Sequence, residues 1–572
     1  MRQLDQLSAF ALQFLSSFQA SSPPEVQCSG STFVGKDIHF HGTHQEFFGG
    51  IPYAEPPVGL LRLKAPVAKT GIQAENGVFD ASEYGYSCIQ PGIAEDIVSE
   101  DCLTVNILRP AILPENVSLP VLFWTYGGGF STGASSFYNG SAIVARSINR
   151  GTPTIYVSFN YRLGPLGFPQ GSEAASRRYL NLGLRDQMIA LRWVKENIAA
   201  FGGDSEKVTI FGQSAGGIMT SILLLQPQIS NLAAAAIIQS GAGAALPFFT
   251  PERNEKAWNT FVSFVPGCSS WVGTSFSMTC LRKANTSAIL EGFREVYKDP
   301  RAREEFWFSP NVDGERGLVP DLPSRLISNI QLPFIAGANL DEGRCYVSHN
   351  MSSRTISQIL GTEFVPSPRD ISENRIRNII SETYGPPTIP SAIINDLMML
   401  YPDNPFLGSP YGTGKETFGF SSDYKRMAAM NGDLMFHSQR RMIMQHAANN
   451  TVKTFGYLFS CRLPIFPPHS GVPHAAELPF IFGGLGIWED HMSDASAADW
   501  TLSETMLDYW ISFATSLDPN DGLGHARPIW PLYTPTSEVL LQLECDNTTV
   551  VTDDYRWEQI RYINFEADVF HH

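Results

Sequence analysis

The stretch that most constrains this chain is Gly-Gln-Ser-Ala-Gly at residues 212–216. A short run of β-branched and aromatic residues, 208–211, precedes it and predicts a buried strand. An apolar run at 218–225 follows it and predicts a helix. A glycine on each side of Ser214 allows a strand-to-helix turn too tight for a Cβ atom. The pattern therefore predicts that the Ser214 hydroxyl stands at the tip of a sharp turn, beside the amino end of a helix.

Other parts of the chain alternate between predicted strands and helices. An amphipathic helix is predicted over 183–200, and short buried strands are predicted at 119–126, 154–159, 234–239, 332–336 and 455–459. This alternation is typical of an α/β fold with a central, mostly parallel sheet flanked by helices. Residues 350–440 are more helical and irregular, so we interpret them as a helical insertion over the carboxyl ends of the strands. We expect a single domain over 21–572 after a leader at 1–20.

Composition and short motifs favour a secreted protein. The formal net charge of −16 argues against partners such as nucleic acid or an anionic membrane surface. No apolar run reaches about 18 residues, so no transmembrane segment is predicted. Residues 1–20 have a mostly apolar centre and end on a small residue, which favours a signal peptide over a short helix. Six Asn-x-Ser/Thr sites are candidates for glycosylation: Asn116, Asn139, Asn285, Asn350, Asn449 and Asn547.

The eight cysteines suggest disulfides rather than a metal site. Two pairs bracket short loops and suit loop staples in an oxidising compartment, namely Cys88 with Cys102 and Cys268 with Cys280. No C-x-x-C pair is present, which argues against zinc. A histidine cluster near the start is interpreted as part of an exposed hairpin rather than a metal site: His39, His41 and His44. Spacing does not decide the partners of Cys28, Cys345, Cys461 and Cys545.

A serine hydroxyl is a weak nucleophile and needs a base that is itself oriented by a third group. With this type of turn the order along the chain is serine, acid, histidine. His474 lies in a Gly- and Pro-rich loop after the strand predicted at 455–459, whereas His437 and His446 lie in helical runs. The acid is expected directly after the strand at 332–336, where spacing leaves both Asp341 and Glu342 open.

A glycine run at 127–129 follows the strand predicted at 119–126. It offers backbone N–H groups that no side chain obstructs, as the loop that stabilises an oxyanion does. The alternative is a phosphate-binding loop, but the spacing and the lysine of that motif are missing.

With these motifs the chain resembles the type-B carboxylesterases, the α/β-hydrolase family of carboxylesterases, cholinesterases and fungal lipases. The resemblance extends from about residue 34 to about residue 533 and includes the segments 50–59, 99–107, 126–130, 160–162 and 211–217. It implies an α/β-hydrolase fold and a serine carboxylic-ester hydrolase whose partner is a small-molecule ester. It implies no metal and no organic cofactor.

The resemblance also assigns roles to individual residues. It implies Ser214 as nucleophile, His474 as base and Glu342, rather than Asp341, as the acid. It implies three donors to the oxyanion, namely Gly128, Gly129 and Ala215, and Ser240 as a support for the triad. It also implies two disulfides, Cys88–Cys102 and Cys268–Cys280. An aromatic segment falls where the family builds part of its acyl pocket, although an ordinary core cluster is an equal alternative: Phe306, Trp307 and Phe308.

Two departures from the family pattern narrow the range of substrates that we expect. Many members have glutamate before the nucleophile, where this chain has Gln213, so the charge beside the site differs. Only 13 residues separate Cys88 from Cys102; four are acidic and none is aromatic. Such a loop does not suit a choline site or a large apolar lid. We therefore expect an esterase for small to medium carboxylic esters; the alternatives are a lipase or an esterase for feruloyl- or gallate-type esters. A non-enzymatic adhesion protein is disfavoured by the complete set of Ser214, Glu342 and His474.

One charged pair is interpreted without a functional role. Arg440 and Arg441 are predicted to lie on a solvated helix face.

Overall fold

The computed structural model describes residues 22–71, 76–299, 302, 306–343, 371–385, 389–484 and 492–572. The predicted leader, Cys345 and the candidate glycosylation site Asn350 lie outside these residues.

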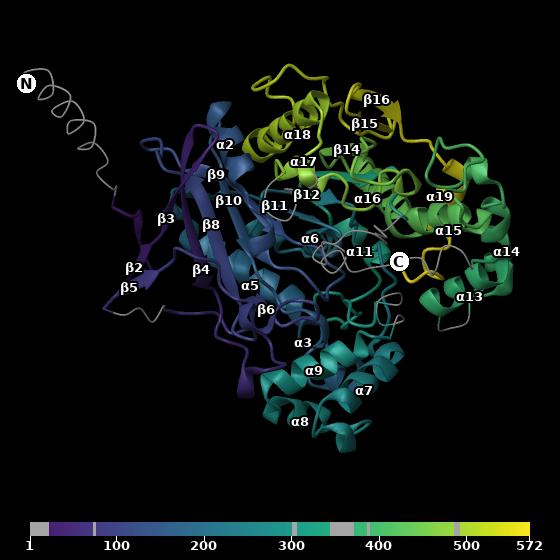
Figure 1. Cartoon of the computed structure of the whole chain (residues 1–572), viewed down its shortest axis with the longest axis horizontal. Helices are drawn as coiled ribbons and strands as arrows, with labels where there is room; N and C mark the ends of the chain where they lie inside the picture. The colour runs from purple at the N-terminus through teal and green to yellow at the C-terminus, as the bar shows by residue number, and fades with distance from the viewer. Residues whose placement is uncertain are drawn as a thin grey trace, which may run out of the picture.

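One large sheet of 11 strands forms the centre of the molecule (Figure 1). All strand pairs from β10 to β15 are parallel, and antiparallel pairs close both ends. The mostly parallel sheet that the sequence predicts is thus confirmed. In spatial order the strands are β16(Thr549–Thr552), β15(Val539–Leu543), β14(Thr454–Phe459), β13(Phe334–Asn339), β12(Ala235–Gln239), β11(Gly203–Gln213), β9(Leu119–Thr125), β10(Ile155–Phe159), β8(Thr104–Pro110), β4(Thr43–Pro52) and β3(Lys36–Phe40).

Two small sheets are formed by strands from the amino-terminal part of the chain. The first joins β1(Glu25–Cys28), β2(Ser31–Val34) and β5(Val78–Asp80), and the second joins β6(Ser87–Cys88) and β7(Val98–Ser99). The histidine cluster of the sequence falls on the β3–β4 hairpin, where His39 pairs across the strands with His44. The prediction of a hairpin there is confirmed.

Helices cover both faces of the large sheet (Figure 1). α2(Ser141–Asn149) and α18(Ala497–Ser516) pack together over one face, and α5(Leu182–Asn197) and α6(Ala215–Leu224) pack over the other. The remaining helices are α3(Gly164–Gly167), α4(Gly171–Ser176), α7(Glu255–Phe264), α8(Ser277–Lys283), α9(Thr286–Val296), α11(Pro323–Leu326), α13(Glu373–Tyr384), α14(Ser391–Leu400), α15(Ser422–Gly432), α16(Ser438–Asn449), α17(Leu478–Ile481) and α19(Trp557–Phe565). None of these helices is long and apolar enough to cross a membrane, a search limited to the described residues.

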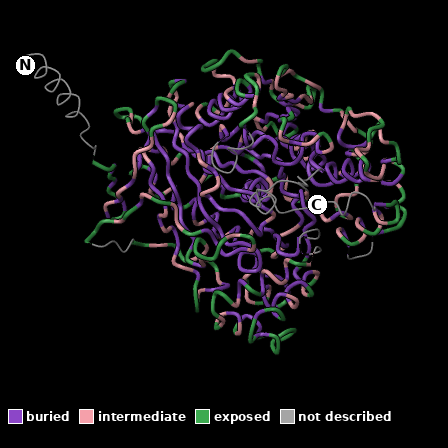
Figure 2. The backbone as a smooth tube through the Cα atoms, viewed as in Figure 1, coloured by how far each residue is buried: buried purple, intermediate pink, exposed green. Residues whose placement is uncertain are grey.

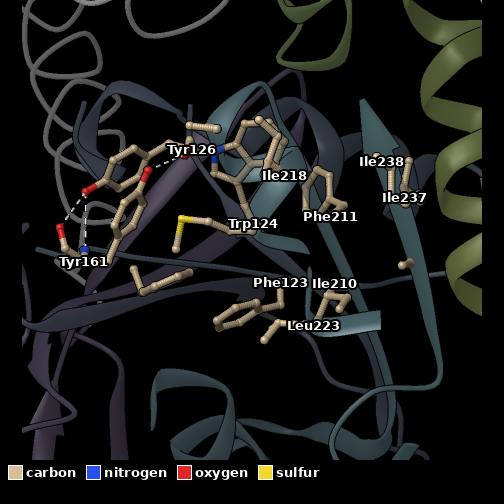
Figure 3. Packing of buried hydrophobic residues seen from close by; sticks show 14 of the residues in the cluster. Phe123, Trp124, Tyr126, Tyr161, Ile210, Phe211, Ile218, Leu223, Ile237 and Ile238 are labelled. Carbon is tan, nitrogen blue, oxygen red and sulfur yellow. Dashed lines mark hydrogen bonds between the residues drawn. The ribbon is translucent and has the colours of Figure 1, made fainter. Parts of the chain in front are cut away.

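The core lies along the central strands, which are buried on both faces (Figure 2). Side chains alternate between the faces of a strand, so neighbouring residues of β9 serve different layers. Trp124 packs on Phe211 of β11, with ring centroids 4.7 Å apart (Figure 3). It also packs on Phe482 at 5.1 Å, whereas Phe123 stacks on Phe159 of β10 at 4.8 Å. Such burial on both sides explains why these strands are continuous apolar runs in the sequence.

A second apolar cluster joins α13, α14 and α15 to α19. Of these helices, α13, α14 and α15 lie in the described part of 350–440, the segment predicted as a helical insertion, whereas α19 comes from the carboxyl-terminal part of the chain. The interpretation of Arg440 and Arg441 was wrong, because both guanidinium groups are buried and pair with Asp553 at 2.6 and 2.9 Å. Asp553 follows them by more than a hundred residues, so no local pattern could reveal the pairing.

Three disulfides join cysteines that the structure describes. Cys88–Cys102 and Cys268–Cys280 confirm the two pairs that the resemblance implies, and Cys461–Cys545 is the pair that spacing left open. Among the described cysteines Cys28 is a buried free thiol. Of the candidate glycosylation sites the structure describes, Asn139 is half-buried and the others are exposed, namely Asn116, Asn285, Asn449 and Asn547.

Candidate active site

Ser214 lies between the last residue of β11 and the first residue of α6. Its φ of 57° and ψ of −128° are strained for a residue with a side chain, as expected for a serine at a strand-to-helix turn. The turn packs directly on β9: a Cβ on Gly216 would lie 2.0 Å from the Thr125 oxygen. A Cβ on Gly212 would lie 2.5 Å from the Gly216 oxygen. The two glycines are therefore required by close backbone approach, and the predicted turn is formed.

Glu342 and His474 meet beside this turn, although 132 residues separate them. Glu342 follows β13, and His474 lies in the loop after β14, next to β13 in the sheet. The two side chains contact each other through His474 Nδ1 and Glu342 Oε2, 2.6 Å apart. The other carboxylate oxygen accepts hydrogen bonds from the Asn339 N–H at 2.6 Å and from the Ser240 hydroxyl. Both oxygens of the Glu342 carboxylate thus have hydrogen-bond partners, and the carboxylate orients the imidazole through its Nδ1 edge.

Asp341 serves the same loop in another way. Its carboxylate accepts hydrogen bonds from Ser409 Oγ at 2.7 Å and from the Val472 and Tyr411 N–H groups, both at 3.0 Å. Its own N–H donates to the Val472 oxygen at 3.0 Å. Asp341 therefore ties the loop that carries His474 to the end of β13, while Glu342 contacts the histidine itself. Geometry separates the two acids that spacing left open.

Two further side chains touch the His474 imidazole. Gln213 is fully buried, and its Nε2 lies 3.3 Å from His474 Nε2. The Phe436 ring lies against the imidazole with centroids 4.7 Å apart and an angle of 33° between the planes. Phe436 belongs to a π-helical turn, η10(Asp433–His437), a distortion often found at functional sites. Sequence reasoning missed Phe436, because nothing in its local pattern distinguishes it from a core residue.

A second buried carboxyl, that of Glu477, is linked to Glu342 through Asn339. Glu477 accepts hydrogen bonds from Asn339 Nδ2 at 2.7 Å and from Gln239 Nε2 at 3.3 Å. Burial, reinforced by the negative charge of Glu342, raises the pKa of the Glu477 carboxyl. Sequence reasoning missed this residue as well. Because Asn339 also donates from its N–H to Glu342, one residue links the two carboxyls.

The glycine run lies directly against the serine turn. A Cβ on Gly127 would come within 2.8 Å of the Ser214 Cβ. The preceding residue, Tyr126, is held by Tyr161, whose hydroxyl donates to the Tyr126 oxygen at 2.9 Å (Figure 3). Gly128 and Gly129 both have a positive φ, 110° and 59°. Neither of their N–H groups has an acceptor within the described part of the chain, and the Ala215 N–H begins helix α6 and so has no helical acceptor.

The three predicted acyl-pocket residues are all buried. Phe308 packs edge-on against Phe261 of α7 and Phe293 of α9, with ring centroids 6.2 and 6.3 Å away. Phe308 therefore packs between these helices, and its role in the acyl pocket stays a prediction. For Phe306 and Trp307 a role in the acyl pocket stays a prediction.

This geometry suits acyl transfer. A serine at a strained turn, an imidazole paired with a buried carboxylate, and backbone N–H groups beside the serine are the parts that such a reaction needs. Each part comes from a different loop at the carboxyl ends of the strands, where ligand sites of parallel sheets are found.

The model of the carboxylesterase family matches residues 22–563. Lipase 1 of Geotrichum candidum is 31% identical, over 91% of this chain and 92% of its own length. Secreted lipase 1 of Botryotinia fuckeliana is 32% identical, over 91% and 90%.

Solved structures agree with the α/β-hydrolase fold. Aspergillus niger EstA has a TM-score of 0.79 at 24% identity and covers 96% of this chain and 99% of its own. A structure named PNB esterase has a TM-score of 0.72 at 26% identity, over 94% and 99%.

Proposed function

This chain belongs to the carboxylesterase family and is a serine carboxylic-ester hydrolase, and on that premise we propose that Ser214, His474 and Glu342 are its catalytic triad. The observation that carries the proposal is the 2.6 Å contact between His474 Nδ1 and Glu342 Oε2 beside the serine turn. This contact holds the Nδ1 proton on the imidazole, so that Nε2 is the basic nitrogen.

In the proposed reaction His474 Nε2 takes the Ser214 proton as the serine oxygen attacks the ester carbonyl. The carbonyl oxygen becomes an anion, and the N–H groups of Gly128, Gly129 and Ala215 donate hydrogen bonds to it. The tetrahedral intermediate collapses, and His474 gives its proton to the leaving alcohol. Water then attacks the acyl-enzyme by the same sequence and releases the carboxylic acid. Ser240 and Asn339 take no part in the chemistry but hold the Glu342 carboxylate.

We propose small to medium carboxylic esters as substrates. The loop between Cys88 and Cys102 supports this, because it is short and three of its four acidic residues are exposed, namely Glu95, Asp96 and Asp101. It lacks the apolar surface that a lid needs to cover a long acyl chain. The lipase alternative keeps its own support, since the curated relatives are named lipases. Rates measured against acyl chain length, below and above substrate solubility, separate the two.

We also propose that the protein is secreted. Three disulfides favour an oxidising compartment, and five described glycosylation motifs are at least partly accessible. One relative is named a secreted lipase. The mass of the protein recovered from culture medium tests whether residues 1–20 are removed and whether glycans are attached.

The Ser214→Ala variant tests the triad. We expect hydrolysis of p-nitrophenyl butyrate to fall by about four to six orders of magnitude, as for other serine triads. Labelling by a fluorophosphonate should disappear as well. Ser221→Ala is the matched control, because Ser221 is a buried serine on the adjoining helix α6 whose hydroxyl has no hydrogen-bond partner among the described residues. If Ser214→Ala kept its activity or its label, Ser214 would not be the nucleophile; a chain with no label at all would revive the adhesion alternative.

A further inference from the structure

A hollow of about 270 Å³ opens on the surface at the carboxyl end of α6. Arg185 and Arg192 of α5 and Arg316 of the loop before α11 line it, and no carboxylate does. Its charge is therefore about +3, whereas the whole chain carries −16. The hollow is thus locally basic on an acidic molecule, although Arg185 and Arg316 also line an adjoining hollow that contains Glu252 and Asp313.

The three arginines are poorly neutralised by their neighbours. Arg192 and Arg316 make no ion pair with any residue the structure describes. Arg185 is half-buried, and its contact with Asp313 is long, at 3.8 Å. The Asp313 carboxylate is already shared with two backbone N–H groups, those of Leu318 at 3.2 Å and Val319 at 2.7 Å. The guanidinium groups thus keep donors for an external anion.

The wall that carries Arg316 is preformed. Asp313 closes the loop through its bonds to Leu318 and Val319, and Gly317 donates to the Gly314 oxygen at 2.7 Å. Gln226 donates to the Leu318 oxygen at 2.6 Å, which fixes the loop to the end of α6. Ordering of the loop therefore costs little when a ligand binds.

Besides the arginines, the hollow has an apolar wall and two side-chain amides, those of Gln226 and Gln228. Met188 and Ile189 of α5 lie on the same helix face as Arg185 and Arg192, three to four residues apart, and Leu318 faces them from the loop. A ligand that fits must combine an anionic head with an aliphatic body, because a bare ion leaves the apolar wall uncovered. The fork of a guanidinium matches the two oxygens of a carboxylate.

We propose that this hollow binds an amphiphilic monocarboxylate, with its head on Arg185, Arg192 and Arg316 and its chain on Met188, Ile189 and Leu318. The site is separate from the serine turn. Helix α6 begins at the turn and ends just before the hollow, so its 10 residues put about 15 Å between them. The proposal does not depend on the triad, although carboxylates of this class are what ester hydrolysis releases.

Calorimetric titration tests the proposal. The protein is first treated with a fluorophosphonate, so that the serine site is closed, and then titrated with decanoate, decanol or inorganic phosphate at low ionic strength. We expect one site for decanoate and at least about tenfold weaker binding of decanol and of phosphate. Raising the salt concentration to 0.5 M should weaken decanoate binding severalfold, because the arginines are accessible to solvent.

Variants locate the site. Arg192→Gln combined with Arg316→Gln should weaken decanoate binding by about ten- to a hundredfold, since two charge-assisted contacts are lost. Arg178→Gln is the matched control: Arg178 is also exposed, but it lines only the adjoining hollow, which contains Glu252 and Asp313. The affinity of the Arg178→Gln variant for decanoate should change less than twofold.

Three results would overturn the proposal. The double variant could bind decanoate as the unchanged protein does, decanol could bind equally well, or phosphate could match decanoate. Failure of the fluorophosphonate to attach would instead contradict the role of Ser214. The titration is then repeated on the untreated protein, so the two failures stay distinct.

Discussion

Gln213 is the residue whose replacement tests the electrostatics of the site most directly. Its Nε2 lies 3.3 Å from His474 Nε2, the nitrogen that must accept the serine proton. An amide is neutral in either orientation, so it can face both the neutral and the protonated imidazole. A carboxylate at this position would favour the imidazolium strongly. We therefore predict that Gln213→Glu shifts the acidic limb of the kcat/KM profile to higher pH.

The distance sets the size of the shift. Two unit charges 3.3 Å apart interact by about 1.3 kcal/mol with the dielectric constant of water and by about 5 kcal/mol at an effective value of 20. Since 1.4 kcal/mol is about one pH unit, and observed effects of one neighbouring charge reach about three units, we expect a shift of about one to three pH units. Full burial of Gln213 favours the upper part of this range.

Initial rates on a soluble p-nitrophenyl ester, measured from pH 4 to pH 9, give the position of the acidic limb of the kcat/KM profile. Gln213→Met is the matched control, since it removes the amide but adds no charge, and its limb should stay within about half a pH unit of the unchanged protein. An unchanged limb in Gln213→Glu, or an equal shift in both variants, would refute the reasoning. The negative charge of Glu342 and the buried Glu477 carboxyl are common to all three proteins and so do not affect the comparison.

Two other predictions concern residues that hold the site and the fold. Asp341→Asn keeps one acceptor but loses the charge that binds the His474 loop, so kcat should fall about tenfold with little change in KM; Ser409→Ala, which removes one of the three contacts, should cost less. Asp553→Asn leaves Arg440 and Arg441 buried without their counter-charge and should lower the free energy of unfolding by about 3–5 kcal/mol, whereas Asp518→Asn in the exposed pair with Lys453 should cost at most about 1 kcal/mol. Denaturant titration measures both, and equal losses would contradict this reading of the buried network.

The same network makes stability depend on acid. Burial opposes ionisation of Asp553, but Arg440 and Arg441 outweigh it and hold the pKa of that carboxyl below its ordinary value. A carboxyl with a lowered pKa stabilises the fold above the pKa of the unfolded chain, about 4, and the contribution is lost as the pH falls below that value. Asp553→Asn should therefore flatten the loss of stability below about pH 4, as well as lower stability at neutral pH.

Local patterns predicted what depends on local constraints. The strands and the serine turn follow from runs of buried residues and from two glycines whose Cβ atoms have no room. Contacts between distant segments were not predictable in this way. Arg440 and Arg441 have the pattern of an exposed helix, yet Asp553 buries them, and Cys461 finds Cys545 across 84 residues. Asp341 and Glu342 are adjacent acids, and only the packing of the loop after β14 gives them different partners.

The position of the imidazole depends on parts of the chain that no motif links to it. Phe436 lies on the ring from the π-helical turn η10. That turn is fixed by the carboxyl-terminal segment, because Arg556 binds Asp433 at 2.7 Å and Tyr555 lies 2.9 Å from His437 Nδ1. Burial, reinforced by the charge of Arg556, lowers the pKa of His437 well below its ordinary value, which favours the neutral imidazole. Tertiary contacts from residues 555–556 thus hold side chains of the distorted turn, and such contacts leave no pattern in the sequence around Phe436.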